Sequence, residues 1–175
     1  MNLEIKQAEF NQETALLHLY QTIAEISDGI IRNPSEIDLA YIKAFLNNSI
    51  SNGLILVGVI DDEIVGEINA HTPSIIAFQH IMTDLTIVVN PQFQGMGIGR
   101  KLFEYFLETV VAEYNHILRI ELYVREHNIR NVKFYESLGF INEGRQKNKI
   151  YISDSEFETP LHMAWFNPRY KKGQT

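Results

Sequence analysis

The segment between residues 88 and 101 constrains the fold of this chain more than any other feature. It reads Val-Val-Asn-Pro-Gln-Phe-Gln-Gly-Met-Gly-Ile-Gly-Arg-Lys and lies between a β-branched run and a helical pattern. Its glycines alternate at positions 95, 97 and 99, so one turn of backbone carries few side chains and a ligand can approach it closely. The first N–H groups of the following helix form an anion-binding end, which suits a phosphate. Arg100 and Lys101 add positive charge nearby.

The spacing of these glycines excludes two common nucleotide loops. A dinucleotide fingerprint requires G-x-G-x-x-G directly after the strand, whereas this chain has G-x-G-x-G after the loop of residues 90–94. A P-loop requires Gly-Lys followed by Ser or Thr, but here Gly99 precedes an Arg, a Lys and a Leu. A tight strand-to-helix turn without a ligand is the alternative interpretation, although one glycine would serve that purpose.

Hydrophobic periodicity predicts the elements around the glycine segment. Strands are expected at residues 3–7, 54–60, 63–70, 80–89 and 119–124, and helices at residues 14–27, 35–48, 102–111 and 128–138. Two more strands, from residue 140 and over residues 161–166, are expected around a polar loop.

The order of these elements predicts the topology of one domain. A helix between the strands at 80–89 and 119–124 makes those two strands parallel, whereas the earlier strands form an antiparallel meander. We therefore expect an α/β fold with a mixed, mostly antiparallel sheet, one central parallel pair and flanking helices over residues 1–170. Residues 171–175 are expected to be a frayed tail. A binding crevice is expected at the carboxyl ends of the parallel pair.

Composition narrows the classes of function. The absence of cysteine excludes a disulfide scaffold, a zinc-thiolate site and a cysteine nucleophile. A net charge of −7 argues against nucleic-acid binding and mildly favours a cationic partner. No apolar run is long enough to cross a membrane and the start lacks a signal-peptide pattern, so a cytoplasmic protein without a membrane partner is expected. The six histidines show no metal-ligand spacing, and no metal is expected.

Two motifs resemble those of the GCN5-related N-acetyltransferase (GNAT) superfamily. Residues 94–99 are similar to its Q/R-x-x-G-x-G/A signature. Residues 128–140 resemble its second motif, with its Asn, its Tyr and a closing Gly-Phe. The expected element order is also that of the family, so the resemblance covers nearly the whole chain. Residues 143–145 and 163–164 further resemble a bacterial branch that includes small-amine and amino-acid acetyltransferases.

The resemblance implies acetyl-CoA as the acyl donor. The pyrophosphate would lie against the amides of the glycine segment, and the pantetheine would pair with the end of the preceding strand and lie near Asn128. The residues implied in acetyl-CoA binding are Ile87, Val88, Val89, Gln94, Gly95, Met96, Gly97, Ile98, Gly99, Arg100, Lys101, Asn128, Val132 and Tyr135. Family members often carry a small residue where Val132 stands.

Acetyl transfer to an amine requires a neutral amine, a donor to the oxyanion and a proton for the departing thiolate. The backbone N–H of Val89 is the candidate oxyanion donor. Asp84, where the family often has glutamate, and Glu67 are candidate bases, and a solvent-facing strand position is the alternative for each. Tyr135 is the candidate acid, with a core aromatic as the alternative.

We therefore expect an acetyl-CoA-dependent N-acetyltransferase that acts by direct attack on a primary amine of a small molecule, such as an amino acid or a polyamine. Acetylation of a protein N-terminus or lysine, and a CoA-binding sensor with little turnover, are the alternatives. The late strands could support a homodimer. By the resemblance, the first two helices border the acceptor, although their rings Tyr20, Tyr41 and Phe45 also suit a core.

Overall fold

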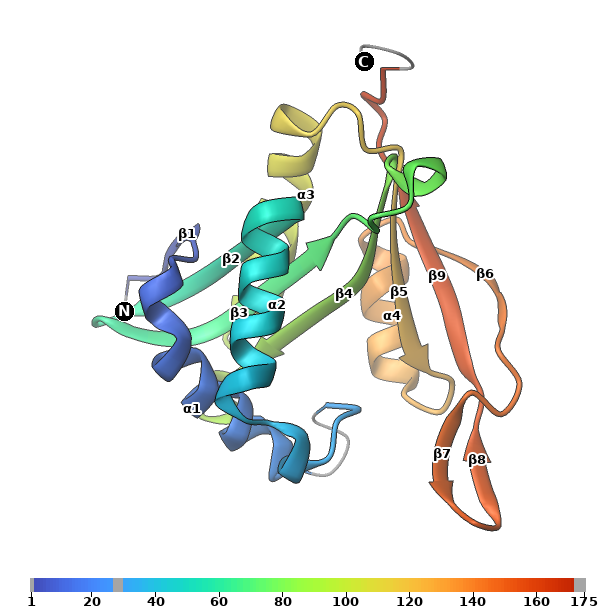
Figure 1. Ribbon diagram of the computed structural model, residues 1–175, viewed down its shortest axis with the longest axis horizontal. Helices are drawn as coiled ribbons and strands as arrows, with labels where there is room; N and C mark the ends of the chain where they lie inside the picture. The colour runs from blue at the N-terminus through green and yellow to red at the C-terminus, as the bar shows by residue number, and fades with distance from the viewer. Residues whose placement is uncertain (1, 27–29, 172–175) are drawn as a thin grey trace. The chain divides into compact units, whose positions relative to one another are not determined.

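A computed structural model describes residues 2–26 and 30–171 of the chain (Figure 1). The chain forms two compact units. The first unit comprises Met1–His71 and Thr86–Thr109, and the second comprises Thr72–Leu85 and Val110–Thr175. The predicted end of the first helix at residue 27 and residues 172–175 of the predicted tail lie outside the described residues. In the part that is described, no helix is long and apolar enough to cross a membrane.

The sheet of the first unit is an antiparallel meander. Its strands are β1 (Glu4–Gln7), β2 (Gly53–Ile60), β3 (Glu63–His71) and the last residues of β4 (Ile81–Val89). Strands β1 and β3 flank β2, and β4 follows β3. Asp61 and Asp62 form the two-residue turn between β2 and β3 at φ 48° and 65°, which matches the twist of a hairpin. The predicted hairpin is confirmed.

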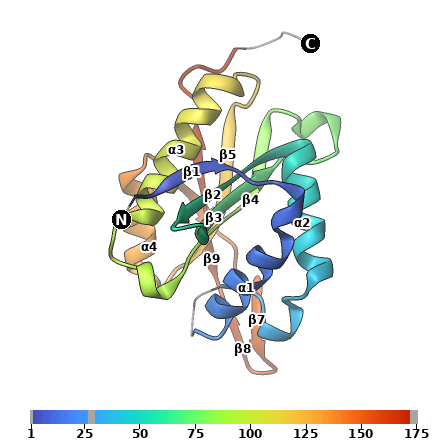
Figure 2. The same cartoon turned by 90° about the vertical axis from the view of Figure 1, so that its left-hand side faces the viewer.

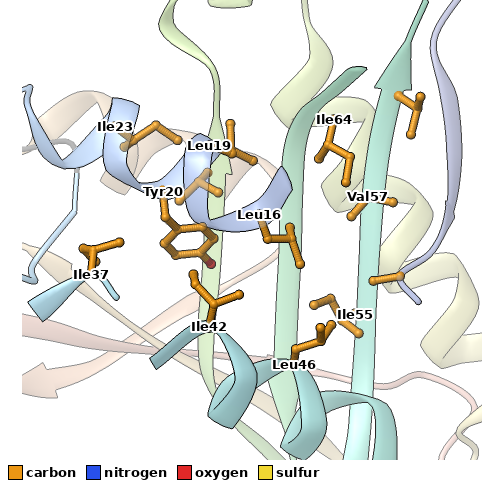
Figure 3. Close-up of a cluster of buried hydrophobic side chains, with 13 residues drawn as sticks. Leu16, Leu19, Tyr20, Ile23, Ile37, Ile42, Leu46, Ile55, Val57 and Ile64 are labelled. Carbon is orange, nitrogen blue, oxygen red and sulfur yellow. The ribbon is translucent and has the colours of Figure 1, made fainter. Parts of the chain in front are cut away.

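Helices cover both faces of the first unit's sheet (Figure 2). Helices α1 (Glu13–Ala24) and α2 (Leu39–Asn52) cover one face. Their apolar stripes pack against β2 and β3 in a buried core (Figure 3). Its central members are Leu16, Leu19, Tyr20, Ile23, Ile42, Leu46, Ile55, Val57 and Ile64. This packing fixes which β3 side chains face the two helices.

The opposite face of that sheet is covered by α3 (Ile98–Glu113). Gly58 and Gly66 are direct cross-strand partners, and neither presents a side chain there. A Cβ at Gly66 would lie 2.8 Å from Leu102 Cδ1 and 3.2 Å from the carbonyl oxygen of Val88. The two glycines thus allow α3 to pack closely on the strands.

The second helix begins later than its sequence pattern predicts. Asn33 and Glu36 form a capping box around a short 3₁₀ turn (Pro34–Glu36), and Ile37 then leaves helical geometry. Asp38 supplies a new cap, because its carboxylate accepts the N–H of Tyr41 at 2.8 Å. The predicted start at residue 35 is therefore wrong by one capped turn. Other 3₁₀ turns are Phe10–Gln12, Ile76–Phe78 and Pro91–Phe93.

The second unit contains the parallel strand pair. The first part of β4 pairs in parallel with β5 (Arg119–Arg125) at Ile81 and Met82. Strand β9 (Pro160–Phe166) pairs antiparallel with β5 and with β6 (Ile141–Arg145), and α4 (Ile129–Ser137) connects β5 to β6. The predicted fold class, a mostly antiparallel α/β sheet with one parallel pair, is confirmed.

The predicted polar loop before the last strand is wrong, because it contains a second hairpin. Its strands are β7 (Ile150–Ser153) and β8 (Glu156–Glu158). Arg125 of β5 donates to both carboxylate oxygens of Glu158 at 2.8 and 2.7 Å. Lys149 Nζ lies 3.4 Å from the centre of the Tyr123 ring. These polar contacts join the hairpin to β5.

Candidate active site

The glycine segment connects β4 to α3 in the first unit. Strand β4 ends at Val89, and the Asn90 side chain accepts the N–H of Gln92 at 3.0 Å. A 3₁₀ turn follows, and Gly95 and Gly97 then take φ values of 81° and 77°. Such angles cost an L side chain strain, so glycine is required at both positions. Gly99 lies inside the helix without a positive φ.

This geometry leaves the glycine segment open to a ligand. Residues 94–97 are exposed, and a Cβ at Gly95 or Gly97 would meet no atom within 4 Å. The N–H of Lys101 donates to the carbonyl of Gly97 at 3.1 Å, which closes the first helical turn. The N–H groups before it belong to the helix end where an anion is stabilised. Arg100 is partly neutralised by Glu104 at 3.3 Å.

Glu67, one of the two candidate bases, is fully buried in the first unit. It lies on β3 and faces the helices, because its cross-strand partner Val57 belongs to the core against α1 and α2. The Tyr20 hydroxyl donates to Glu67 Oε2 at 2.6 Å. Glu67 Oε1 is buried and has no hydrogen-bond partner within the described ranges. The solvent-facing alternative for Glu67 is therefore wrong.

Burial raises the pKa of Glu67 from its ordinary value of 4.5 to about 8, although the neighbouring Tyr20 hydroxyl and Asn69 amide oppose the rise. Desolvation disfavours the carboxylate, whereas a donated hydrogen bond favours it. A carboxyl with this pKa exchanges its proton near neutral pH, which is the range where general bases are most effective. This property suits the predicted role of Glu67 as a base.

Asp84, the other candidate base, differs from Glu67 in its exposure, its unit and its backbone geometry. It is exposed, belongs to the second unit and has a φ of 53°. This left-handed residue interrupts the extended geometry of β4 two positions after Met82, the last residue in the parallel register with β5. The structure thus agrees with the alternative for Asp84, a solvent-facing residue of the strand.

Tyr135 lies on α4 and Asn128 directly precedes this helix, both in the second unit. Asn128 caps this helix, since its side chain accepts the N–H of Asn131 at 3.1 Å. Tyr135 is 9% exposed and packs against Phe134 and Phe140, with ring centres 5.4 and 6.0 Å away. Burial raises its pKa to about 12, so the phenol stays protonated at any working pH. Val132 is half-buried on the same helix.

The first unit thus brings together part of the predicted site. Residues 87–101 form one continuous strand end, turn and helix start, and Gly99 lies beside Val89, with a Cβ there 3.5 Å from Val89 Cγ2. Strand β3 lies next to this strand end, because the N–H of Asn90 donates to the carbonyl of Val65 at 2.8 Å. Asp84, Asn128, Val132 and Tyr135 belong to the second unit.

Sequence reasoning missed the partners of Glu67. Tyr20, Asn69 and Ser49 are buried, and the last two join Tyr20 through hydrogen bonds. One signal could have pointed to them. Glu67 and Asn69 are two residues apart and therefore lie on the same face of an otherwise apolar strand, where buried polar groups require partners. The identity of the partners requires the fold.

The fold and the glycine segment define the class of this chain, an α/β protein with an open, glycine-rich turn after a central strand. The sequence model described as "Acetyltransferase (GNAT) family" matches residues 15–140. The chain belongs to this family, and the resemblance of its two motifs is confirmed. Within the described residues, no group of three His, Cys, Asp or Glu side chains could hold a metal ion.

Among curated proteins, the chain is similar to the [Ribosomal protein bS18]-alanine N-acetyltransferase of Salmonella typhimurium. The two are 34% identical over 82 residues, which is 47% of this chain and 53% of the relative. The Escherichia coli protein of the same name is 33% identical over the same shares. The chain thus matches about half the length of these curated relatives.

Solved structures match over nearly the whole chain. A GNAT-family acetyltransferase from Streptococcus pneumoniae has a TM-score of 0.77 and 26% identity, covering 94% of this chain and 99% of that one. The structure of yncA from Salmonella typhimurium, with its cofactor acetyl-CoA, has a TM-score of 0.83 and 18% identity, covering 100% and 99%. These likenesses support the GNAT fold for both units.

Proposed function

We propose that this chain transfers the acetyl group of acetyl-CoA to a primary amine of a small molecule. The observation that carries the proposal is Glu67: a carboxyl with one unpartnered, buried oxygen and a pKa of about 8, on the strand next to the end of β4. Family membership and the open glycine segment support acetyl-CoA as the donor. The yncA structure with acetyl-CoA is consistent with this choice.

Two parts of the first unit suit the groups of acetyl-CoA. Exposed backbone over residues 94–97 and the first turn of α3 suit the pyrophosphate, and the end of β4 at residues 87–89 suits the pantetheine. For the second unit, the family resemblance implies that Asn128, which caps α4, and Val132 and Tyr135 within α4 contact acetyl-CoA. When bound, acetyl-CoA supplies an activated acetyl group as a thioester, so no covalent intermediate on the protein is needed.

Three groups of the chain would perform the chemistry. Glu67 would take a proton from the acceptor ammonium, directly or through a water, and leave a neutral nucleophile. The N–H of Val89 would donate to the oxyanion that forms after attack. Tyr135 would donate a hydrogen bond or a proton to the departing sulfur. Asp84 is the less suitable base, because it is exposed and lacks the buried environment of Glu67.

A test of the base compares Glu67→Gln with Asp84→Asn at several pH values. If Glu67 is the base, Glu67→Gln lowers the rate most at low pH, and high pH restores it by supplying neutral amine. The exposed Asp84→Asn variant retains the wild-type profile. A wild-type profile in Glu67→Gln, at equal folding, would contradict the assignment of Glu67.

A protein α-amine is the second candidate acceptor, and two observations favour it. The curated relatives are named for acetylating an alanine of a ribosomal protein. An α-ammonium has a pKa near 8, so its proton would pass to Glu67 without a penalty, whereas a lysine-like ammonium with a pKa near 10.4 would resist.

A panel that follows CoA release separates the acceptors. Polyamines, free amino acids and a hexapeptide beginning with alanine are compared by kcat/KM. The small-amine proposal requires an amino acid or polyamine to be at least tenfold better than the peptide. A preference for the peptide would replace it with the second candidate. Hydrolysis of the thioester that no amine stimulates would favour a CoA-binding sensor.

We infer a single acetyltransferase domain over residues 1–170, a cytoplasmic setting, no nucleic-acid partner and a homodimer through the late strands. The acidic balance of the chain, with a net charge of −7, supports the absence of a nucleic-acid partner. Chromatography with light scattering measures the oligomeric state directly.

A further inference from the structure

A chain of buried hydrogen bonds leads to Glu67 in the first unit. The Ser49 hydroxyl on α2 donates to Asn69 Oδ1 at 3.4 Å, and Asn69 Nδ2 on β3 donates to the Tyr20 hydroxyl at 3.4 Å. Tyr20 on α1 then donates to Glu67 Oε2 at 2.6 Å. All four residues are at most 5% exposed. Every bond points in the same direction, towards the carboxyl.

From this geometry, we propose that Tyr20, Asn69 and Ser49 are positioning residues that stabilise the ionised form of Glu67 against its burial and leave Oε1 as the reacting oxygen. The inference rests on the proposed role of Glu67 as the base. The hydrogen-bond chain would allow a carboxyl in an apolar core to release and accept a proton.

The one-way order of the bonds has an electrostatic consequence. A hydroxyl has one proton, so a tyrosine that donates to the carboxyl can only accept from its other neighbour. Asn69 fills that position with an amide N–H, and Ser49 in turn donates to the Asn69 oxygen. Bonds aligned in this way polarise one another and stabilise negative charge at the end of the chain, Glu67.

The chain also distinguishes the two carboxyl oxygens. Oε2 is committed to Tyr20, whereas Oε1 has no partner among residues 2–26 and 30–171. A buried oxygen without a partner is costly, so it is expected to have a role in binding or chemistry. With Oε2 fixed, a proton that arrives at Glu67 binds at Oε1.

The surroundings of this chain are aromatic. The Tyr20 ring extends from α1 towards Ile42 of α2 (Figure 3). It packs against Phe45 and Tyr41, with ring centres 5.1 and 6.0 Å away. Among the described residues, the tyrosines that interact electrostatically with Glu67 are Tyr20 on α1 and Tyr41 on α2. The Arg32 guanidinium lies 4.2 Å above the Tyr41 ring. Both tyrosines have a raised pKa, so they remain neutral while Glu67 titrates.

The experiment measures the titration of Glu67 in two independent ways. The first is the pH profile of kcat/KM. Deprotonation of the acceptor amine contributes equally to the acid limb of every variant, so a difference between variants reports a changed pKa in the enzyme. The second is the infrared band of the protonated carboxyl, which needs no substrate and is identified by its loss in Glu67→Gln. The variants are Tyr20→Phe, Asn69→Leu and Ser49→Ala. Tyr41→Phe is the matched control, because it removes a neighbouring phenol outside the chain.

We expect Tyr20→Phe to raise the titration midpoint of Glu67 by about one pH unit or more, since a hydrogen bond to a charged group stabilises it by about 1.5–3 kcal/mol. Asn69→Leu raises it less and Ser49→Ala least, whereas Tyr41→Phe leaves it unchanged. If Tyr20→Phe does not fold, the titration midpoint of Glu67 in Asn69→Leu tests the proposal.

Failure of this inference is distinguishable from failure of the base assignment. An infrared midpoint that stays at the wild-type value in the folded chain variants overturns the positioning role, whatever the activity. A midpoint that moves while Glu67→Gln keeps the wild-type rate profile supports the hydrogen-bond chain and removes Glu67 as the base. Equal shifts in Tyr20→Phe and Tyr41→Phe would also overturn the inference, because a general loosening of the core would explain both.

Discussion

The buried carboxyl of Glu67 should make the stability of this protein fall as pH rises. Its pKa is about 8 in the folded chain, against an ordinary value of 4.5. Between these values the folded state holds a proton that the unfolded state has released, so raising pH favours unfolding. The contribution is fully present below about pH 4.5 and is lost as pH rises through about 8.

The size of the effect follows from the same two values. They differ by about 3.5 pKa units, and each unit corresponds to about 1.4 kcal/mol, so the ionised group costs on the order of 5 kcal/mol above pH 8. A typical domain is stable by only about 5–15 kcal/mol. The loss should therefore be visible as a lower denaturant midpoint.

Urea unfolding at pH 5, 7 and 9 measures this prediction. The wild-type protein should lose several kcal/mol between pH 5 and 9, and Glu67→Gln should lose much less, because its amide oxygen still accepts from Tyr20 but cannot ionise. Glu63→Gln, at an exposed position of the same strand, is the control and should follow the wild type. If wild type and Glu67→Gln show the same pH dependence, Glu67 ionises in the folded chain as easily as in solution, and the reasoning fails.

Three further predictions test the glycine segment, the acid and the packing of α3. Gly97→Ala should weaken acetyl-CoA binding at least tenfold by calorimetry and lower the stability by about 1 kcal/mol, because its φ is 77°. Gly99→Ala, whose Cβ has only an ordinary contact, should change neither the affinity nor the stability. Equal acetyl-CoA affinities of the two variants would contradict the proposed site. Tyr135→Phe should keep acetyl-CoA affinity and lower kcat at least tenfold, and a rate within twofold of wild type would leave Tyr135 as packing. Gly66→Ala should destabilise the fold by about 1–3 kcal/mol in urea, because its Cβ would overlap buried Leu102; an unchanged midpoint would show that α3 moves freely.

Local patterns predicted the elements of this fold where one periodicity and one cap decide the outcome. The β-branched runs before and after Asp61 and Asp62 form the expected hairpin, and the strand–helix–strand order gives the parallel β4 and β5. The start of α2 was misplaced because two caps compete, Asn33 for a 3₁₀ turn and Asp38 for the helix. Ile37 lies between these two caps, leaves helical geometry and is buried in the core.

The β7–β8 hairpin was missed for a different reason. Strand prediction relies on one face being apolar and buried, but Tyr151 and Phe157 pair across this hairpin with 61% and 48% of their surfaces exposed. Polar contacts to β5 hold it instead, such as the bond between Arg125 and Glu158. A charge pair 33 residues apart leaves no periodic signal in the sequence.

For the candidate site, the sequence predicted residue types better than their environments. The glycine segment could be located because its backbone demands glycine at 95 and 97. The burial of Glu67 could not, since a single glutamate in an apolar strand also suits an edge facing solvent. Its partner Tyr20 is 47 residues away on another element, and only the packing of α1 on β3 brings the two together.

The burial of Glu67 is a disadvantage for stability that makes sense only if the group has a function. A glutamine would accept the same hydrogen bond from Tyr20, would not ionise and would leave the core more stable at high pH. Proteins retain such costly groups chiefly where activity requires them. The two measurements on Glu67→Gln should therefore move in opposite directions, with stability at pH 9 rising and the acetylation rate falling. A variant that is both more stable and equally active would mean that Glu67 is a structural residue, and the search for the base would return to Asp84.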